Sequence, residues 1–295
     1  MVFTGIGYTL LEILVNVCVL LINNPEEIEF WMLLTHGLFG IGGLIGPFLI
    51  YIFEGKAFGV FGIMVMAVIP FYFKIKTPEL NGFEVEDATS PALKAKTITN
   101  KLEYWLCGLM FLYLGLECTY GGWISSYSVL VGVTDNKGAT VFPIVFWVLM
   151  TFFRILLAYA PGKSSKKLQI LILANIVSGI VSLLIIYAGH VKLACYLSGA
   201  LFGLSMSSIY PLIMTLPLEK GLNVEDGQTA NIVMAGVVSE GLLTMFVGWL
   251  MDWFSPNMLF YSLSFFALLM WFIRLYCLKL IDRQLDSLKS SGLGQ

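Results

Sequence analysis

The stretch Trp31-Met-Leu-Leu-Thr-His-Gly-Leu-Phe-Gly-Ile-Gly-Gly-Leu-Ile-Gly-Pro-Phe-Leu-Ile-Tyr-Ile-Phe53 contains no acidic residue, lysine or arginine. The hydrocarbon core of a bilayer is about 30 Å thick, and about 20 apolar residues cross it as a helix. A continuous apolar run without two-residue alternation is unlike a β-barrel strand. This stretch therefore predicts a membrane-spanning helix, whose glycines permit close helix contacts and whose Pro47 permits a kink.

The rest of the chain repeats this pattern. Hydrophobic residues make up 58% of the chain and charged residues 12%, whereas a soluble domain is about one quarter charged. Mean hydropathy is +0.85. We predict an all-α fold, a polytopic membrane helical bundle of about nine transmembrane helices. The predicted segments are residues 3–22, 29–53, 56–74, 100–131, 140–160, 168–189, 192–216, 228–251 and 257–281.

A polar stretch divides the predicted bundle into three helices and six. The predicted domains are a partial N-terminal bundle (1–74), a linker (75–99), a six-helix bundle (100–281) and a tail (282–295). Most lysine and arginine residues of the loops fall on the side of the linker, and basic loops face the cytoplasm. We therefore expect a multi-pass protein of the plasma membrane or an endomembrane, with a cytoplasmic linker and a cytoplasmic C-terminus.

Ionisable residues inside spanning helices are costly, and each one is a candidate functional residue that faces protein or water. In the first segment, Tyr8, Glu12 and Asn16 recur at a spacing of four residues, which places a phenol, a carboxylate and an amide on one helix face. That face is predicted to line a cavity.

The fourth segment repeats this pattern with Tyr113 and Glu117, followed by Trp123 and Tyr127. A polar group beside aromatic rings suits a sugar, because binding sites combine apolar walls with a few polar anchors. Trp123 is also compatible with an aromatic belt at the membrane surface. A belt does not account for Glu117, which is predicted to face the cavity.

Three further side chains have two interpretations each. Arg154 either extends to the membrane surface or forms a buried pair with an acid. Glu240 is either a coupling-ion carboxylate or a hydrogen-bonded packing group. His36 lies near a helix start, where we expect a solvated imidazole.

The seventh segment contains Gly199-Ala-Leu-Phe-Gly203, followed by three serines and Tyr210-Pro211. Small residues four apart allow close helix contacts, and interrupted helices are typical of transport pathways. No catalytic motif is present, so we expect no enzyme activity and no cofactor apart from a coupling ion. The five cysteines lie in apolar segments without metal-ligand spacing, and the net charge of −2 gives no indication of a nucleic-acid partner.

Several motifs together resemble the major facilitator superfamily, in its fucose-permease and sodium-dependent glucose transporter-like branch. Gly5–Asn16 is similar to the fourth helix of that branch, and Gly37–Pro47 to its fifth. The same order continues through Phe111–Tyr127, Phe146–Arg154 and Gly203–Pro211, which resemble its seventh, eighth and tenth helices. The resemblance implies an incomplete fold that matches the fourth to twelfth of twelve helices.

The resemblance also implies roles. Glu12 would be a coupling carboxylate for H⁺ or Na⁺, Asn16 a lining residue, and Glu117 with Trp123 part of a sugar site. The first hypothesis is therefore a secondary active transporter, or a large fragment of one, for a monosaccharide or similar small polar solute. The alternative is a non-transporting membrane scaffold or complex subunit on a degenerate carrier fold. Expected partners are the solute, the bilayer, and either the missing N-terminal helices or a partner subunit.

Overall fold

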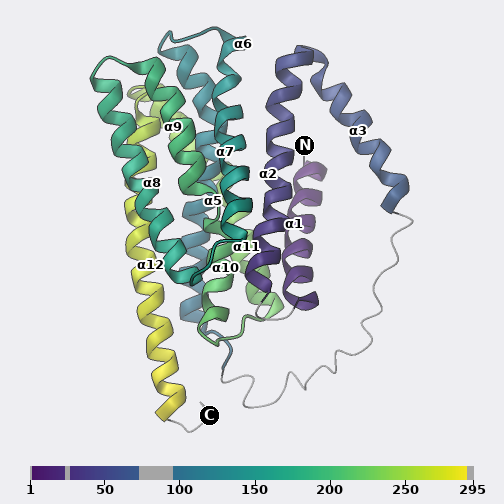
Figure 1. The fold of residues 1–295 in the computed structure, drawn as a ribbon, viewed down its shortest axis with the longest axis vertical. Coiled ribbons are helices and arrows are strands. Elements are labelled where there is room, and N and C mark those ends of the chain that lie inside the picture. Colours follow the sequence, from purple (N-terminus) through teal and green to yellow (C-terminus); the bar gives the residue numbers. More distant parts are fainter. Residues whose placement is uncertain (1, 24–26, 73–95, 291–295) are drawn as a thin grey trace.

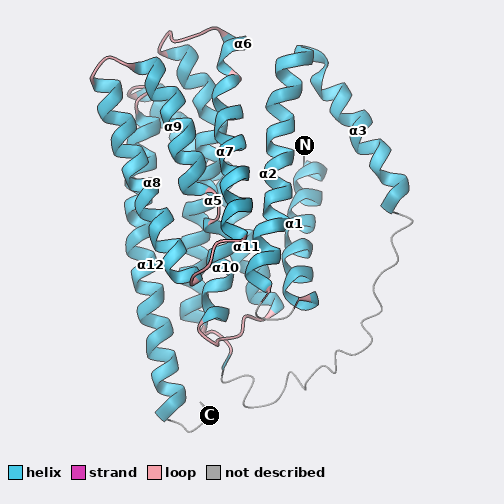
Figure 2. Ribbon diagram, viewed as in Figure 1, coloured by secondary structure: helices cyan, strands magenta, loops and turns pink. Residues whose placement is uncertain are grey.

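The structure is a computed structural model that describes residues 2–23, 27–72 and 96–290. These described residues are helices joined by short turns and include no strand (Figure 2). An isolated bridge pairs Thr97 with Asn223. The predicted all-α fold is confirmed. Most of the predicted linker lies outside the described residues, so the domain boundaries stay predictions.

Three helices form the N-terminal part and eight form the C-terminal part of the described chain (Figure 1). The N-terminal helices are α1 (Val2–Ile22), α2 (Ile28–Phe53) and α3 (Ala57–Tyr72), with the short 3-10 helix η1 (Glu54–Lys56) between α2 and α3. The C-terminal helices are α5 (Asn100–Leu130), α6 (Asn136–Ala139), α7 (Val141–Ala158), α8 (Ser164–Tyr187), α9 (Val191–Met206), α10 (Ile209–Glu219), α11 (Asp226–Trp253) and α12 (Met258–Ser290).

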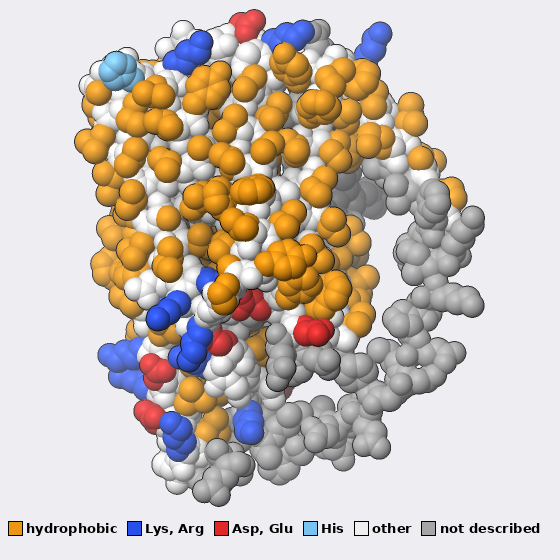
Figure 3. Space-filling view, in the orientation of Figure 1, with side chains coloured by type: hydrophobic (Ala, Val, Ile, Leu, Met, Phe, Trp, Pro, Cys, Tyr) orange, Lys and Arg blue, Asp and Glu red, His pale blue; other side chains and the backbone are white. Residues whose placement is uncertain are grey.

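The helices have the length and composition of membrane spans. Within the described ranges, six stretches are long and apolar enough to cross a bilayer: α2, α6 with α7, α8, α9 with α10, α11 and α12. Of the other predicted spans, α1 has an apolar stretch at Thr9–Leu20, α3 has 16 residues, and α5 has 31 residues with Glu103 and Glu117 among them. Figure 3 shows hydrophobic side chains over the middle of the molecule and charged ones toward its ends. The chain is a multi-pass membrane protein.

Two predicted segments differ from the observed helices. The predicted seventh segment is broken into α9 and α10 at Ser207 and Ser208, as its serines and Pro211 lead one to expect. The last helix continues to Ser290, past the predicted end at residue 281. It continues because its apolar side remains packed: Leu288 is buried, and the amide of Gln284 donates a hydrogen bond of 2.7 Å to the Thr97 carbonyl.

Close helix contacts hold the C-terminal part together around α5, which packs chiefly against α11 and α12. Glycine allows close approach at one contact of α11 with α5 and at one contact of α9 with α7. A Cβ atom on Gly236 would come within 2.9 Å of a Leu114 methyl carbon, and one on Gly203 within 2.6 Å of the Phe146 carbonyl oxygen. Membrane helices approach closely where small residues meet, because packing between them is a main source of their association.

The two ends of α2 define two ends of the bundle, which we call the Glu29 end and the Tyr51 end. The starts of α2, α5, α8 and α11 lie at the Glu29 end, and the starts of α6 and α9 and the end of α5 lie at the Tyr51 end (Figure 1). Hydrogen bonds connect neighbouring helix ends at both levels: Ser165 with Glu219 at the Glu29 end, and Tyr127 with Asn257 at the Tyr51 end. The N-terminal and C-terminal parts meet along α1 and α2.

Candidate functional site

A buried polar network lies where α1 and α2 meet α5, α7 and α10. The predicted residues Glu12, Asn16, Tyr113, Glu117 and Arg154 all belong to it. Asn16 and Tyr113 are completely buried, Glu117 and Arg154 are almost so, and Glu12 is half-buried. Polar groups in the interior of a spanning bundle need partners, since lipid offers none. The network therefore gathers residues that lie far apart in the sequence.

Arg154 is the centre of the network. Its side chain is 1% exposed, so of the two interpretations of Arg154 the buried one is correct and the extension to the membrane surface is wrong. Its Nη1 donates to the His36 carbonyl at 2.7 Å, and its Nη2 donates to the Tyr113 hydroxyl at 3.3 Å. One guanidinium thus binds groups of both parts of the chain. The fork of donors on arginine suits it to several acceptors at once.

The third acceptor of Arg154 arises from the break between α9 and α10. Its Nε donates to the carbonyl of Ser207. In an uninterrupted helix, that carbonyl would accept from the N–H of residue 211, but Pro211 has no N–H. The proline therefore leaves a main-chain oxygen available inside the membrane, and Arg154 binds it.

Glu117 is the acid partner of Arg154. Its Oε2 lies 3.7 Å from Arg154 Nη2, and the Tyr113 hydroxyl, one helical turn away on α5, donates to the same oxygen. The Tyr113 hydroxyl also lies 2.9 Å from the Met206 carbonyl at the helix break. Since a phenol has one proton, it donates to one of these oxygens at a time. The carboxylate is thus held by one cation and one phenol in the interior of the bundle.

A second acid, Glu12, lies on the other side of the network. Its carboxylate interacts with the Tyr210 hydroxyl and with Asn16, and it is close enough to Arg154 for a direct electrostatic attraction. The Asn16 amide donates to the Tyr210 hydroxyl at 2.9 Å and to the Glu12 carbonyl at 2.8 Å. The face of α1 with Glu12 and Asn16 therefore contacts the C-terminal part, while the predicted cavity along this face stays a prediction.

The structure corrects the interpretation of His36. We predicted a solvated imidazole, but its side chain is 6% exposed. Nε2 lies 3.2 Å from Asn16 Oδ1, and the ring lies 4.2 Å from the Tyr210 ring between centroids. Since the Asn16 amide nitrogen already serves two acceptors, its oxygen is the acceptor here and Nε2 the donor. The prediction failed because nearness to a helix start does not reveal what the neighbouring helices cover.

The balance of charge in the network is unequal. Two carboxylates, Glu12 and Glu117, face one guanidinium, Arg154, and the two acids repel each other. Buried charges are tolerated when they are paired. If Glu12 and Glu117 are both ionised, one additional positive charge, such as a proton or a small cation, would balance these three side chains.

The other predicted residues lie outside this network. Trp123 donates from Nε1 to the Thr244 carbonyl at 2.8 Å and packs against Gly248, so it binds α11. Tyr127 is buried near the Tyr51 end, with its hydroxyl 3.1 Å from Asn257 Oδ1. Glu240 is half-buried on α11 and borders the network, because it is close enough to Tyr210 and Cys118 to act on both electrostatically. The side chain of Tyr8 lies outside the described part of the structure.

Sequence reasoning missed His36, Tyr210 and the Ser207 carbonyl as members of the network. Tyr210 stands directly before Pro211 in the predicted broken helix, which is a signal that could have found it. No residue pattern indicates a main-chain acceptor such as Ser207. Among the described residues, no group of three or more His, Cys, Asp or Glu side chains could hold a metal ion.

Comparison with known proteins finds a similarity to solved structures. No protein-family model and no curated protein sequence matches the chain. A solved structure described as "a Major Facilitator Superfamily (MFS) transporter, FucP, in the outward conformation" matches it with a TM-score of 0.53 and 16% sequence identity. The match covers 75% of this chain and 54% of that chain, so this chain spans about half the length of FucP. The order of its helices and this match together identify the chain as having the fold of a major facilitator superfamily transporter.

Proposed function

We propose that the chain is a secondary active transporter, or a large part of one, that moves a monosaccharide or similar small polar solute by alternating access, coupled to H⁺ or Na⁺. In this proposal it acts as a carrier rather than as an enzyme and needs no cofactor beyond the coupling ion. The observation that carries the proposal is the buried network of Glu12, Arg154 and Glu117. It joins the two parts of the chain at the place where a carrier must bind and release its solute.

The polar groups of the network support a hydroxyl-rich solute. Two phenols, Tyr113 and Tyr210, lie with ring centroids 6.4 Å apart around the helix break. The side-chain hydroxyls of Ser207 and Ser208 are completely buried and have no hydrogen-bond partner. Buried polar groups normally have partners, and an orphaned hydroxyl marks a place where a water or a ligand group fits. A sugar offers both hydroxyls for the serines and an apolar ring face for the tyrosines.

The unequal charge supports coupling to a cation. With both acids ionised, the Glu12, Glu117 and Arg154 side chains sum to one negative charge. A proton or Na⁺ that binds with the solute would neutralise this excess, which lowers the cost of moving the site away from water. Glu12 is the more accessible acid, since it is half-buried while Glu117 is 2% exposed. We therefore assign the coupling role to Glu12 and the anchoring of Arg154 to Glu117.

The basic residues support an orientation in the membrane. At the Glu29 end, Lys163 and Lys220 lie between helices, and Lys166 and Lys167 lie in the first turn of α8. Basic loops are retained on the cytoplasmic side. In the proposal, the Glu29 end faces the cytoplasm and the Tyr51 end faces the other side of a plasma membrane or endomembrane.

Uptake into liposomes tests the proposal. The purified chain is reconstituted, and accumulation of radiolabelled L-fucose, D-glucose and D-galactose is measured under an imposed H⁺ or Na⁺ gradient. Glu12→Gln is expected to abolish gradient-driven accumulation while exchange of solute across the membrane continues. Glu117→Gln is expected to abolish both. Asp252→Asn, at an exposed acid near the end of α11, is the matched control and is expected to transport like the wild type.

The outcomes separate the two candidate functions. Accumulation by Glu12→Gln and Glu117→Gln at the wild-type level would contradict the assigned roles. A folded chain that takes up no sugar, but copurifies in stoichiometric amounts with other membrane proteins, would instead favour a scaffold or complex subunit.

A further inference from the structure

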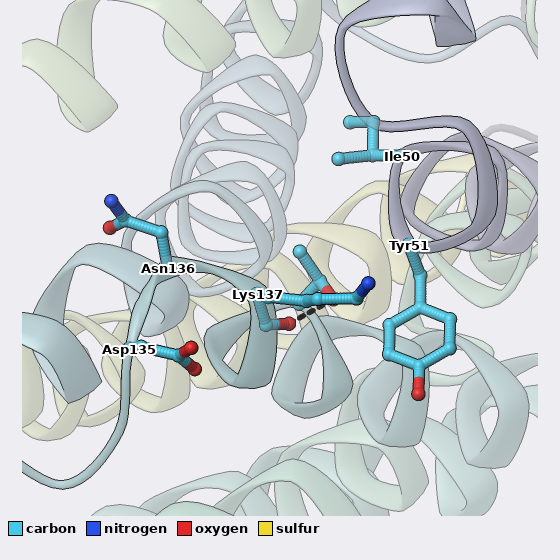
Figure 4. Close-up of a pocket in the computed structure, with 6 residues that line it drawn as sticks. Ile50, Tyr51, Asp135, Asn136 and Lys137 are labelled. Atoms are coloured by element: carbon cyan, nitrogen blue, oxygen red, sulfur yellow. Dashed lines mark hydrogen bonds between the residues drawn. The ribbon is translucent and has the colours of Figure 1, made fainter.

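A cavity opens at the Tyr51 end, between the N-terminal and C-terminal parts of the chain. Its volume is about 450 Å³, which is within the range of small-molecule pockets. Ile50 and Tyr51 of α2 line one side, and residues 135–137 with Thr140, in and around α6, line the other (Figure 4). The cavity is distinct from the buried network, because no residue belongs to both.

The α6 side of the cavity is a well-defined structure. The Asp135 carboxylate accepts a hydrogen bond of 2.8 Å from the Gly138 N–H and so caps α6. The Thr140 hydroxyl donates to the Lys137 carbonyl at 2.8 Å, and the Ser125 hydroxyl joins the Ala139 carbonyl to α5 at 3.0 Å. The cavity wall is therefore fixed to the C-terminal bundle.

The two sides of the cavity touch through Lys137 and Tyr51. The Lys137 ammonium lies 5.8 Å from the centre of the Tyr51 ring, and Figure 4 shows its side chain extended toward the ring. An ammonium at this distance from an aromatic ring is attracted weakly at an exposed site. Tyr51 is 43% exposed, so part of its surface remains accessible to a ligand.

The lining combines one aromatic ring with an amide, an ammonium and a hydroxyl. Such a set binds a polyhydroxylated solute: the ring packs on its apolar face, and the amide of Asn136, which is exposed, and the ammonium of Lys137 bind its hydroxyls. At the Glu29 end the same two parts are joined tightly, by an ion pair of 2.6 Å between Glu29 and Lys167. The cavity therefore lies at the end of the interface that is less tightly joined.

We propose that this cavity is an outer subsite, in which Tyr51, Asn136 and Lys137 bind the sugar before it reaches the buried network. The inference rests on the proposed function and adds a second binding site to it. The subsite raises the local concentration of solute at the entrance, and the weak contact between Lys137 and Tyr51 gives way as the solute passes.

Thiol labelling in proteoliposomes tests the subsite directly. Asn136→Cys is reacted with a membrane-impermeant maleimide, with and without whichever of L-fucose, D-glucose or D-galactose the wild-type chain accumulates, and labelling is read by mass spectrometry of the peptide. The sugar is expected to slow labelling at position 136 at least threefold. Lys192→Cys, at an exposed position at the start of α9, is the matched control and is expected to react at the same rate with or without sugar.

A second variant tests the aromatic wall. Tyr51→Leu is expected to raise KM for uptake about threefold, which is the loss of affinity expected when one weak aromatic contact is removed. The maximal rate is expected to stay within a factor of two of the wild type. Tyr104→Leu, which removes a tyrosine that is 72% exposed on α5, serves as the control for a general effect of losing a ring. Size-exclusion profiles establish that each variant is folded.

The results distinguish the subsite from the proposed function. Wild-type uptake of a sugar, combined with unchanged labelling at position 136 and an unchanged KM in Tyr51→Leu, would overturn the subsite and leave the transporter standing. If the wild-type chain takes up no sugar at all, the proposed function fails, and the subsite fails with it.

Discussion

Helix α2 contacts the C-terminal part very differently at its two ends. At the Glu29 end, Lys167 Nζ lies 2.6 Å from Glu29 Oε1, and the Ser164 hydroxyl donates to the second carboxylate oxygen. At the Tyr51 end, a lysine lies 5.8 Å from a ring centre beside a cavity of about 450 Å³. One end therefore has a partly buried, hydrogen-bonded ion pair, while the other has a weak contact.

In the proposed transporter, this difference would favour opening of the interface at the Tyr51 end. A partly buried ion pair with an added hydrogen bond stabilises a contact more than an exposed cation–ring pair does. A small rotation of α2 at the Tyr51 end would break the contact between Lys137 and Tyr51 and leave the ion pair between Glu29 and Lys167 intact. Four substitutions test the comparison between the ends, from the largest expected effect to the smallest.

Removing Arg154, which binds both parts between the two ends, is expected to have the largest effect. Arg154→Met leaves the Glu117 carboxylate buried without its cation, and breaking a buried pair costs about 3–5 kcal/mol. The melting temperature in detergent, followed by size-exclusion fluorescence, should fall by several degrees. Arg154→Met combined with Glu117→Gln should recover most of the loss, because no unpaired charge remains. If the double variant melts as low as the single one, the ion pair is not what stabilises the centre.

Reversing the charge at the Glu29 end should open that end. Lys167→Glu places two carboxylates against each other, at a cost of about 2–3 kcal/mol for a partly buried pair. The reaction of a thiol introduced by Thr215→Cys, beside Ser164, is then expected to accelerate more than tenfold. Exchanging the charges with Glu29→Lys and Lys167→Glu should restore slow labelling. Equally fast labelling in the exchanged pair would show that the ion pair does not close this end.

Disturbing the close packing along the middle of α2 should lower stability less than the substitutions of Arg154 and Lys167 do. A Cβ atom on Gly43 would come within 2.9 Å of the Trp147 ring, so Gly43→Ala forces the ring or α2 to shift, which costs about 1–2 kcal/mol. Gly46→Ala is the matched control, because its Cβ would meet open space. We expect a lower melting temperature for Gly43→Ala and an unchanged melting temperature for Gly46→Ala. Equal melting temperatures for the two variants would show that close packing of Gly43 against the Trp147 ring does not stabilise the contact between α2 and α7.

The contact between Lys137 and Tyr51 should contribute least to the stability of the protein. Lys137→Gln removes the cation above the Tyr51 ring, and an exposed cation–ring contact contributes about 0.5–1 kcal/mol. Its effect on the melting temperature should be smaller than that of Lys167→Gln, which removes the ion pair at the other end. A larger effect for Lys137→Gln would reverse the comparison.

Much of the fold follows from the sequence because lipid imposes strict demands on it. Long apolar segments can be satisfied only as helices, so the positions of the helices could be read from composition alone. The break at residues 207–208 was foreseeable from the serines and Pro211. The extension of α12 to Ser290 was not foreseeable, since it depends on Gln284 meeting Thr97, a contact between distant parts of the chain.

The candidate site was predicted in part. Three candidates could be predicted because a charged side chain inside a spanning helix is costly unless it has a partner or a function. These are Glu12, Glu117 and Arg154. Their pairing could not be predicted, since each lies on a different helix and the partner depends on how the helices pack. His36 was assigned to solvent for the same reason. Trp123 was a candidate for the sugar site, and its indole N–H binds the Thr244 carbonyl of α11; its role stays a prediction.

Pro211 has no N–H, and so the Ser207 carbonyl has no partner within the helix. Arg154 binds this carbonyl, so the absence of one N–H helps to fix the position of the arginine. Ser207 contributes its main-chain oxygen, so many side chains at position 207 would preserve the contact, whereas any residue other than proline at position 211 would supply an N–H that competes for it. The arginine site is thereby encoded in the backbone. A search for related sites by side-chain chemistry alone would overlook it, while a search for an arginine facing a proline-interrupted helix would find it.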